Sequence, residues 1–215
     1  MKALYPLIYF TFCCFLNVNS QNLQPDMQRL KTICLNLRAS IEVGDIDGLR
    51  NANKEFKKVK TTKFNDFRLK NRTKEQSLNG HFIFEPHFVD DLVKKGKGIV
   101  YRYADRYATR RSNVRELNGI LVKNILLSPK SASIYQLVGN NHMELVFITE
   151  PKGLISVTIF DTKHKVYYKE KKKERAGDIC RVHIFDLPPD GNALIEVTIR
   201  NQSNSEVSCV ILSNQ

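Results

Sequence analysis

Residues 154–160, with the sequence LISVTIF, lie at the centre of the pattern that decides the fold class. Apolar side chains alternate with small polar ones along them, as in a strand with one buried face. The same rhythm extends to both sides, and turn-forming residues such as Gly139, Pro151 and Gly191 interrupt it. Eight strands are expected, at residues 119–127, 133–138, 143–149, 154–161, 165–170, 179–185, 193–200 and 206–213. Short strands at this spacing predict an antiparallel β-sandwich, and eight of them suit a jelly roll.

The chain before residue 119 has helical periodicity instead. Residues 26–43 form an amphipathic pattern that Gly44 ends, and Asp45 is expected to cap a second helix that continues to Val59. The two helices would form an antiparallel helical hairpin. Pro86 suits the first turn of another helix, and residues 100–111 have the pattern of one more. We therefore expect an α+β protein with a signal peptide at 1–20, a mainly helical region at 21–118 and a β-sandwich domain at 119–215.

The first 20 residues have the pattern of a cleavable secretory signal peptide. Lys2 gives a positive start, residues 3–16 are almost entirely apolar, and residues 18–20 are small or β-branched. The apolar run is shorter than the roughly 20 residues of a bilayer span, and no second run is long and apolar enough. We expect a secreted or periplasmic protein cleaved near Ser20-Gln21. An uncleaved anchor stays open as an alternative, whereas a lipoprotein is not favoured, because Thr11 and Phe12 suit acylation of the next cysteine poorly.

The chain is strongly basic. It has 34 Lys and Arg against 22 Asp and Glu, a formal net charge of +12, and such a balance attracts anionic partners. Segment 28–75 alone holds 13 Lys and Arg against six Asp and Glu. The run at 169–175, with five basic and two acidic residues, is expected to be an exposed loop.

An arginine stripe gives the best-defined basic patch. Arg102, Arg106 and Arg110 repeat at every fourth position, so they share one face of the helix expected at 100–111. Lys94 and Lys95 precede them, and arginine suits bidentate contacts to phosphate or carboxylate. These five residues are candidates for anion binding, with an ordinary solvated helix face as the alternative.

Metal-ligand residue types gather only near His81, Glu85 and His87, which are weak candidates for a metal site. Their spacing matches no common zinc pattern, and Pro86 places the two histidines in different elements. We therefore expect no metal and no cofactor.

Three cysteines follow the signal segment: Cys34, Cys180 and Cys209. Alternation places Cys180 and Cys209 on inward faces of their strands. An odd and sparse set favours buried free thiols, which act as small hydrophobes, and a Cys180–Cys209 disulfide is the alternative.

The C-terminal half resembles bacterial pre-peptidase C-terminal-type jelly-roll domains over residues 142–213. The similar stretches are 185–191 (FDLPPDG), the strand at 194–199 (LIEVTI) and 157–161 (VTIFD). The resemblance implies a non-catalytic accessory module of a secreted bacterial protein. This chain departs from the family in lacking its acidic run around the middle strands, so the calcium site of some relatives is not implied. The whole layout also resembles uncharacterised exported proteins of Gram-negative gut-type bacteria, which implies no function.

No enzyme motif is present: there is no nucleophile elbow, paired-acid signature, phosphate loop or dinucleotide fingerprint. We expect a non-catalytic binding or interaction protein whose partner is a protein, an anionic glycan or an envelope component rather than nucleic acid. A structural or assembly accessory of the cell envelope is the alternative. A hydrolase without a recognisable motif is the third possibility, because two catalytic carboxylates leave no local signature.

The signal pattern makes the first prediction. When the full chain is expressed in a secreting bacterial host, we expect the released protein to begin at or near Gln21, because a signal peptidase reads residues 18–20. Intact mass spectrometry of the released protein measures the start. Recovery of a membrane-bound chain that keeps residues 1–20 would contradict cleavage.

Overall fold

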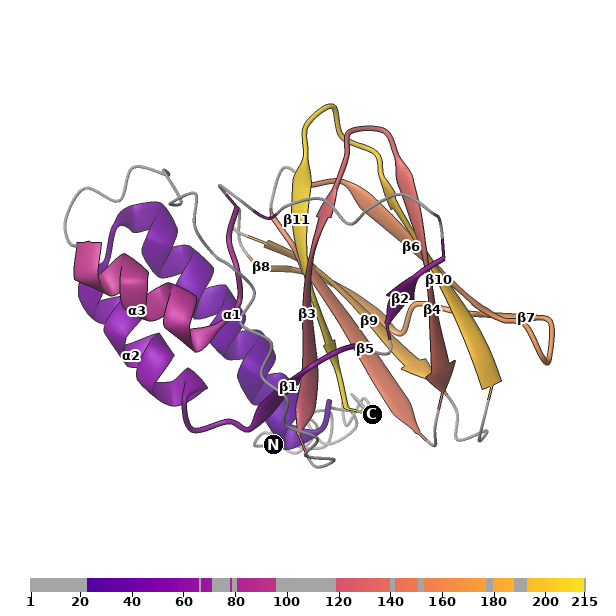
Figure 1. Ribbon diagram of the computed structural model, residues 1–215, viewed down its shortest axis with the longest axis horizontal. Helices are drawn as coiled ribbons and strands as arrows, with labels where there is room; N and C mark the ends of the chain where they lie inside the picture. The colour runs from indigo at the N-terminus through magenta and orange to yellow at the C-terminus, as the bar shows by residue number, and fades with distance from the viewer. Residues whose placement is uncertain are drawn as a thin grey trace, which may run out of the picture.

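A computed structural model provides the structure, which describes residues 23–65, 67–70, 78, 81–95, 119–139, 142–150, 153–176, 180–187 and 193–214. Within them the chain forms three helices and 11 strands. The helices, α1 (Pro25–Val43), α2 (Ile46–Phe56) and α3 (Pro86–Lys95), lie together on one side of a two-sheet sandwich (Figure 1). The expected α+β fold with a C-terminal sandwich is confirmed.

The strands form two sheets. Sheet A has the order β1-β3-β11-β5-β9-β8, and sheet B has the order β2-β4-β10-β6-β7. All the pairs are antiparallel except β1 with β3. The strands are β1 (Thr61–Lys63), β2 (Arg68–Leu69), β3 (Ile120–Leu127), β4 (Ala132–Gly139), β5 (Met143–Thr149), β6 (Ile155–Asp161), β7 (Val166–Tyr168), β8 (Lys172–Ala176), β9 (Cys180–Leu187), β10 (Ala193–Asn201) and β11 (Val207–Ser213). Since β3-β11-β5-β9 faces β4-β10-β6-β7, the sandwich has jelly-roll connectivity.

The helical hairpin follows from its turn and cap. Gly44 has φ +68°, a left-handed conformation that glycine adopts without strain and that ends α1. The Asp45 carboxylate then accepts a hydrogen bond from the Gly48 backbone N–H at 2.9 Å, which caps α2. Helix α3 begins at Pro86, as expected. The helix expected at 100–111 lies outside the described residues.

Sheet A is buried on both faces, and two hydrophobic cores result. One core lies between sheet A and the helices, and Val146 of β5 and Val210 of β11 point into it. The other lies between the sheets and receives Phe147 and Ile211 from the same strands. Every residue of β5 and β11 is therefore buried. This explains why their sequences, MELVFIT and VSCVILS, are nearly continuous apolar runs rather than alternating ones.

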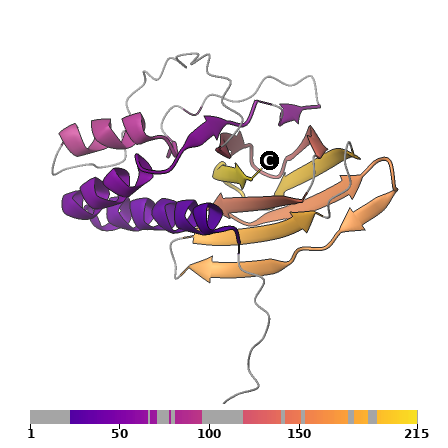
Figure 2. The same ribbon diagram turned by 90° about the horizontal axis from the view of Figure 1, so that it is seen from below.

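Strands β1 and β2 were not expected, because the segment before residue 119 was interpreted as mainly helical. Strand β1 joins the edge of sheet A and β2 the edge of sheet B, so the segment crosses the open edge of the sandwich (Figure 2). Phe64 and Phe67 lie between them and are buried in the core between the sheets. Phe67 stacks on Tyr135 of β4 with ring centroids 4.5 Å apart. Strands of three and two residues are too short to show a periodicity.

The prediction of an exposed loop at 169–175 is wrong in part. Lys172–Ala176 forms β8, which pairs with β9 and is the edge strand of sheet A. Charged side chains suit an edge strand, since they discourage pairing with a second molecule. Lys31 of α1 is buried and donates to Glu174 of β8 at 2.8 Å, which ties the helical layer to this edge.

Arg38 fixes the other end of α1 to sheet A. Its side chain is buried, and Nη2 donates to Ser208 Oγ of β11 at 3.2 Å. Nη1 lies 3.9 Å from Glu150 Oε1, which also accepts from Ser208 Oγ at 2.5 Å. The guanidinium stands 4.5 Å from the centre of the Phe82 ring, a cation–π contact.

The second prediction concerns the buried contacts of Arg38. Arg38→Ala should lower the free energy of unfolding by about 2 kcal/mol, because it removes a buried cation from its partners and leaves a void. Arg38→Met should lower it less, since the methionine refills the space without a charge. Arg29→Ala is the control, because its pair with Glu55 is largely exposed and worth about 0–1 kcal/mol. Urea unfolding measures all three, and an Arg38→Ala variant as stable as the parent would contradict the assignment.

Candidate functional site

A dense group of exposed cations lies on α2 and the turn that follows it. We call this surface the α2 basic face. It comprises Arg50, Lys54, Lys57, Lys58, Lys60 and Lys63, and all six side chains are exposed. Between residues 50 and 63 they are opposed only by Glu55.

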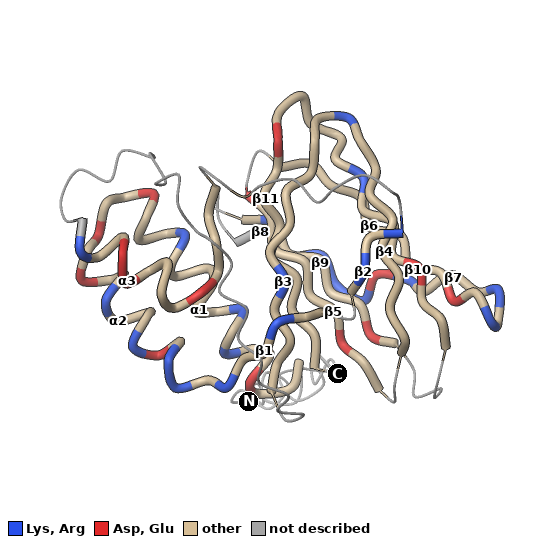
Figure 3. The backbone as a smooth tube through the Cα atoms, in the orientation of Figure 1, with Lys and Arg blue, Asp and Glu red and all other residues tan. Residues whose placement is uncertain are grey.

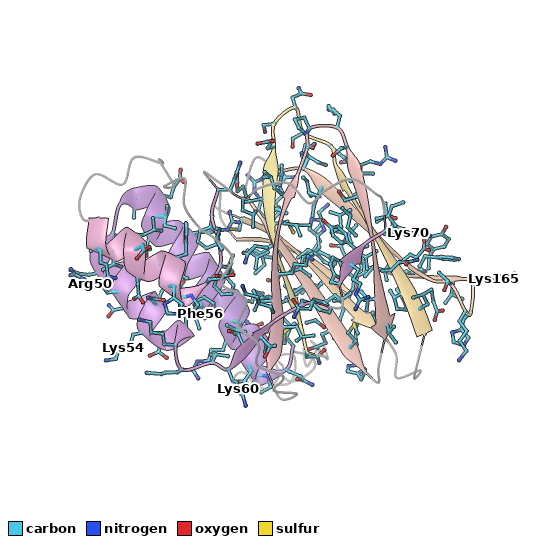
Figure 4. All side chains as sticks on the ribbon, viewed as in Figure 1. Arg50, Lys54, Phe56, Lys60, Lys70 and Lys165 are labelled. Carbon is cyan, nitrogen blue, oxygen red and sulfur yellow. The ribbon has the colours of Figure 1, made fainter. Side chains whose placement is uncertain are left out.

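The α2 basic face exists because of how α2 packs. Leu49, Ala52 and Phe56 point into the core beneath the helices, so the intervening positions face solvent. Figure 3 shows Lys and Arg along the outer side of α2 and its exit toward β1. In Figure 4, Arg50, Lys54 and Lys60 lie on the helical side, and Lys165 lies at the opposite end of the molecule.

Three cations of the α2 basic face pair with carboxylates. Arg50 lies 2.9 Å from Asp47, Lys57 lies 2.7 Å from Asp90, and Lys58 lies 2.5 Å from Glu55. These pairs are at least partly exposed and contribute only about 0–1 kcal/mol each. Residues 50–63 hold six cations against the single carboxylate of Glu55, so this segment has a positive formal charge that can interact with an anionic ligand.

A pocket of about 240 Å³ opens where the α2 basic face meets β1 and the start of α3. Its walls combine cationic, hydroxyl, amide and carboxylate side chains, and its floor is apolar. The walls are lined by Lys60, Thr61, Thr62, Lys63, Asn65, Glu85, Pro86 and His87, and the floor by Phe56, Phe84 and Val122.

Pairing with β3 positions the β1 wall of this pocket. The Ile120 backbone N–H donates to the Lys60 carbonyl at 3.2 Å, and the Phe64 N–H donates to the Val122 carbonyl at 3.0 Å. Gly119 permits this approach, since a Cβ there would lie 3.0 Å from the Lys60 carbonyl oxygen. Lys63 pairs with Val122, so its side chain leaves the sheet on the face that the helices cover.

A stacked aromatic pair positions the α3 wall. The rings of Phe56 and Phe84 have centroids 4.1 Å apart and planes 13° from parallel. The Phe84 N–H also donates to Asn124 Oδ1 of β3 at 2.8 Å. Glu85 and His87 are thereby held in the same pocket lining as Lys60 and Lys63.

The three weak candidates for a metal site do not all lie together. Glu85 and His87 both line the pocket, whereas His81 Nε2 lies 3.3 Å from Glu206 Oε2. Over the part of the chain that the structure describes, no three His, Cys, Asp or Glu residues are grouped so that they could hold a metal ion.

Of the five residues predicted to bind an anion, the structure describes only Lys94 and Lys95. Lys94 is exposed on α3, 3.7 Å from Asp91, and Lys95 is the last residue of that helix. Arg102, Arg106 and Arg110 lie outside the described residues, so the arginine stripe stays a prediction. The sequence did point to the lysines of the α2 basic face, but the pocket beside them depends on β1.

The Cys180–Cys209 disulfide is absent, and Cys34, Cys180 and Cys209 are all buried free thiols. Cys180 faces the helices and Cys209 faces sheet B, with β5 between their strands. Two strand spacings amount to about 10 Å, whereas a disulfide needs Cα atoms within roughly 7 Å. Burial raises the pKa of Cys34 and Cys209 to about 12 and that of Cys180 to about 11, so all three stay as unreactive thiols at neutral pH.

Two further polar clusters hold the β6–β7 end of the sandwich together. His183, buried on β9, lies 2.8 Å from Glu170, and burial lowers the pKa of this histidine. Asp161 is fully buried at the end of β6 and accepts from the ring of His164 at 2.7 Å and from the Tyr168 hydroxyl at 3.0 Å. Both clusters bridge neighbouring strands or a turn, so we assign them to stability.

No protein-family model matches the chain, and no curated protein matches it in sequence. None of the helices in the described ranges is long and apolar enough to cross a membrane.

The third prediction concerns Asp161. Burial would raise its pKa, but hydrogen bonds from the His164 ring and backbone, the Tyr168 hydroxyl and the Lys163 backbone lower it to about 2. Its folded-state pKa is therefore below the usual 3.8, so its contribution to stability is present above pH 3.8 and lost as the pH falls toward 2. Asp161→Asn should cost about 2 kcal/mol at pH 7 and flatten the pH dependence of unfolding in that window.

Urea unfolding of the parent and the variant between pH 2 and 7 tests this prediction. Asp186→Asn, a change of the same chemistry at a partly exposed carboxylate, is the control. An equally steep loss of stability below pH 4 in the Asp161→Asn variant would show that other carboxylates cause it.

Proposed function

We propose that this chain is an exported, non-catalytic binding protein that recognises an anionic ligand through the α2 basic face. The observation that carries the proposal is the gathering of six exposed Lys and Arg between Arg50 and Lys63 beside a lined pocket. Clustered charge of one sign, rather than total charge, attracts a multivalent anion to one place.

Export is the part of the proposal that rests on residues 1–20. Their charged start, apolar run and small residues before Gln21 are typical of a cleaved signal peptide, which would direct the protein to the periplasm or outside the cell. The resemblance of residues 142–213 to accessory modules of secreted bacterial proteins supports the same compartment.

The ligand class follows from the residues on the α2 basic face. It is built mainly from lysine, which acts as a mobile point charge, and only Arg50 carries a planar guanidinium. Within the described residues, its only aromatic neighbour on α2 is Phe56, which is buried, so stacking of exposed bases has no platform there. These features favour an acidic glycan or an acidic protein surface over nucleic acid.

Heparin retention tests the proposal. Lys54→Gln, Lys57→Gln and Lys58→Gln together should weaken binding to immobilised heparin about tenfold or more, because three contacts of about 0.5–1 kcal/mol are lost. The variant should therefore elute at lower salt than the parent, since salt screens the same attraction.

The matched control removes the same charge elsewhere. Lys163→Gln, Lys169→Gln and Lys173→Gln change three exposed lysines on the β6–β7–β8 segment. We expect this variant to elute close to the parent. Equal losses in the two variants would mean that net charge alone causes retention. A third variant, with Ala at Arg102, Arg106 and Arg110, tests on the same column whether the arginine stripe adds to binding.

A further inference from the structure

The pocket between β1 and α3 offers more than positive charge, and we infer that it binds one acidic sugar residue of an anionic glycan. The inference rests on the proposed function and deepens it, because the pocket continues the α2 basic face. The shared chemistry is a sugar ring that bears a carboxylate or a sulfate.

Two lysines provide the anionic subsite. Lys60 precedes β1 and Lys63 is its last residue, and both line the pocket together with Thr61 and Thr62, which bear hydroxyls. Ammonium groups and hydroxyls are hydrogen-bond donors that suit the oxygens of a carboxylate or a sulfate.

Glu85 distinguishes this pocket from a site for a simple inorganic anion. Its carboxylate only accepts hydrogen bonds, and it would repel a bare sulfate or phosphate. A sugar that carries an acidic group also carries neutral hydroxyls, which can donate to Glu85 and to the amide oxygen of Asn65 in the same lining. The combination of donors and acceptors therefore matches a ligand with both kinds of group.

The size and the apolar part of the pocket favour a ligand that inserts a single sugar ring. Its volume of about 240 Å³ is below the ~300–1,000 Å³ of pockets for drug-sized ligands. The half-buried Pro86 gives an apolar contact for the C–H surface of a sugar, and the buried Phe56, Phe84 and Val122 support the lining from beneath. Lys57 and Lys58 lie just before Lys60 in the chain, so neighbouring acidic residues of a longer glycan can contact the α2 basic face.

Calorimetric titration of the full exported chain tests the inference with four probes at one ionic strength. They are a sulfated heparin disaccharide, an unsulfated uronate-containing disaccharide, inorganic sulfate and long-chain heparin. We expect at least one disaccharide to bind about tenfold more tightly than sulfate, since the ring adds contacts that the ion lacks. The two disaccharides show whether the anionic group is a sulfate or a carboxylate.

Three single variants locate the binding. Lys63→Gln should weaken disaccharide binding about fivefold or more, whereas Lys163→Gln, which removes the same charge from an exposed position outside the α2 basic face and the pocket lining, should change it less than about twofold. Glu85→Gln should weaken disaccharide binding but not sulfate binding, because the carboxylate accepts sugar hydroxyls and repels the ion. Thermal unfolding of each variant confirms that the fold is kept.

The outcomes separate the inference from the proposed function. Disaccharides that bind no better than sulfate, equal effects of Lys63→Gln and Lys163→Gln, or tighter disaccharide binding in Glu85→Gln would each overturn the sugar site. Long heparin would still bind in those cases if the α2 basic face works as proposed. If long-chain heparin does not bind the parent protein, both the sugar site and the proposed function are overturned.

Discussion

The double-sided burial of sheet A is the constraint on which the rest of the structure depends. Its central strands β5 and β11 supply alternate side chains to the core under the helices and to the core between the sheets. Because both faces are apolar, neither the helical layer nor sheet B can be removed without exposing a large hydrophobic surface to water. The helices are therefore part of the same folding unit as the sandwich and not an appendage to it.

Within that constraint, buried charges set the position of α1 on the sheet. Lys31 and Arg38 lie seven residues apart on the sheet-facing side of the helix and pair with Glu174 of the edge strand β8 and with Glu150, which follows the central strand β5. Hydrophobic contact alone is non-directional, whereas a buried cation displaced from its carboxylate would lose its compensating interactions. The two pairs thus favour one register of the helix over others that would bury a similar apolar area.

The candidate site lies where the layers meet. Strand β1 is held by β3 and turns Lys63 to the helical side, while Phe84 anchors the entry to α3 through Phe56 and Asn124. The lysines of α2 face solvent because the opposite side of that helix packs into the core. A basic surface next to a lined pocket is therefore a consequence of how the edge of sheet A joins the helices.

Much of the architecture was determined by the sequence itself. The alternation in residues 154–160, the turn residues between strands and the Gly44-Asp45 break predicted the sandwich and the helical hairpin, because these signals act over a few residues. The lysines of the α2 basic face were also visible, since helical spacing separates a solvent face from a core face. Residues 1–20 carry the pattern that predicts export.

Only the tertiary structure decided the features that depend on distant partners. Strands β1, β2 and β8 are short or charged, and they are extended because neighbouring strands offer backbone hydrogen-bond partners. Cys180 and Cys209 looked equivalent in the sequence, yet the strand order places β5 between them and turns them to opposite faces of sheet A. The pocket has the same origin, because Lys63 and Glu85 line one pocket only when β1 pairs with β3 and α3 packs beside them.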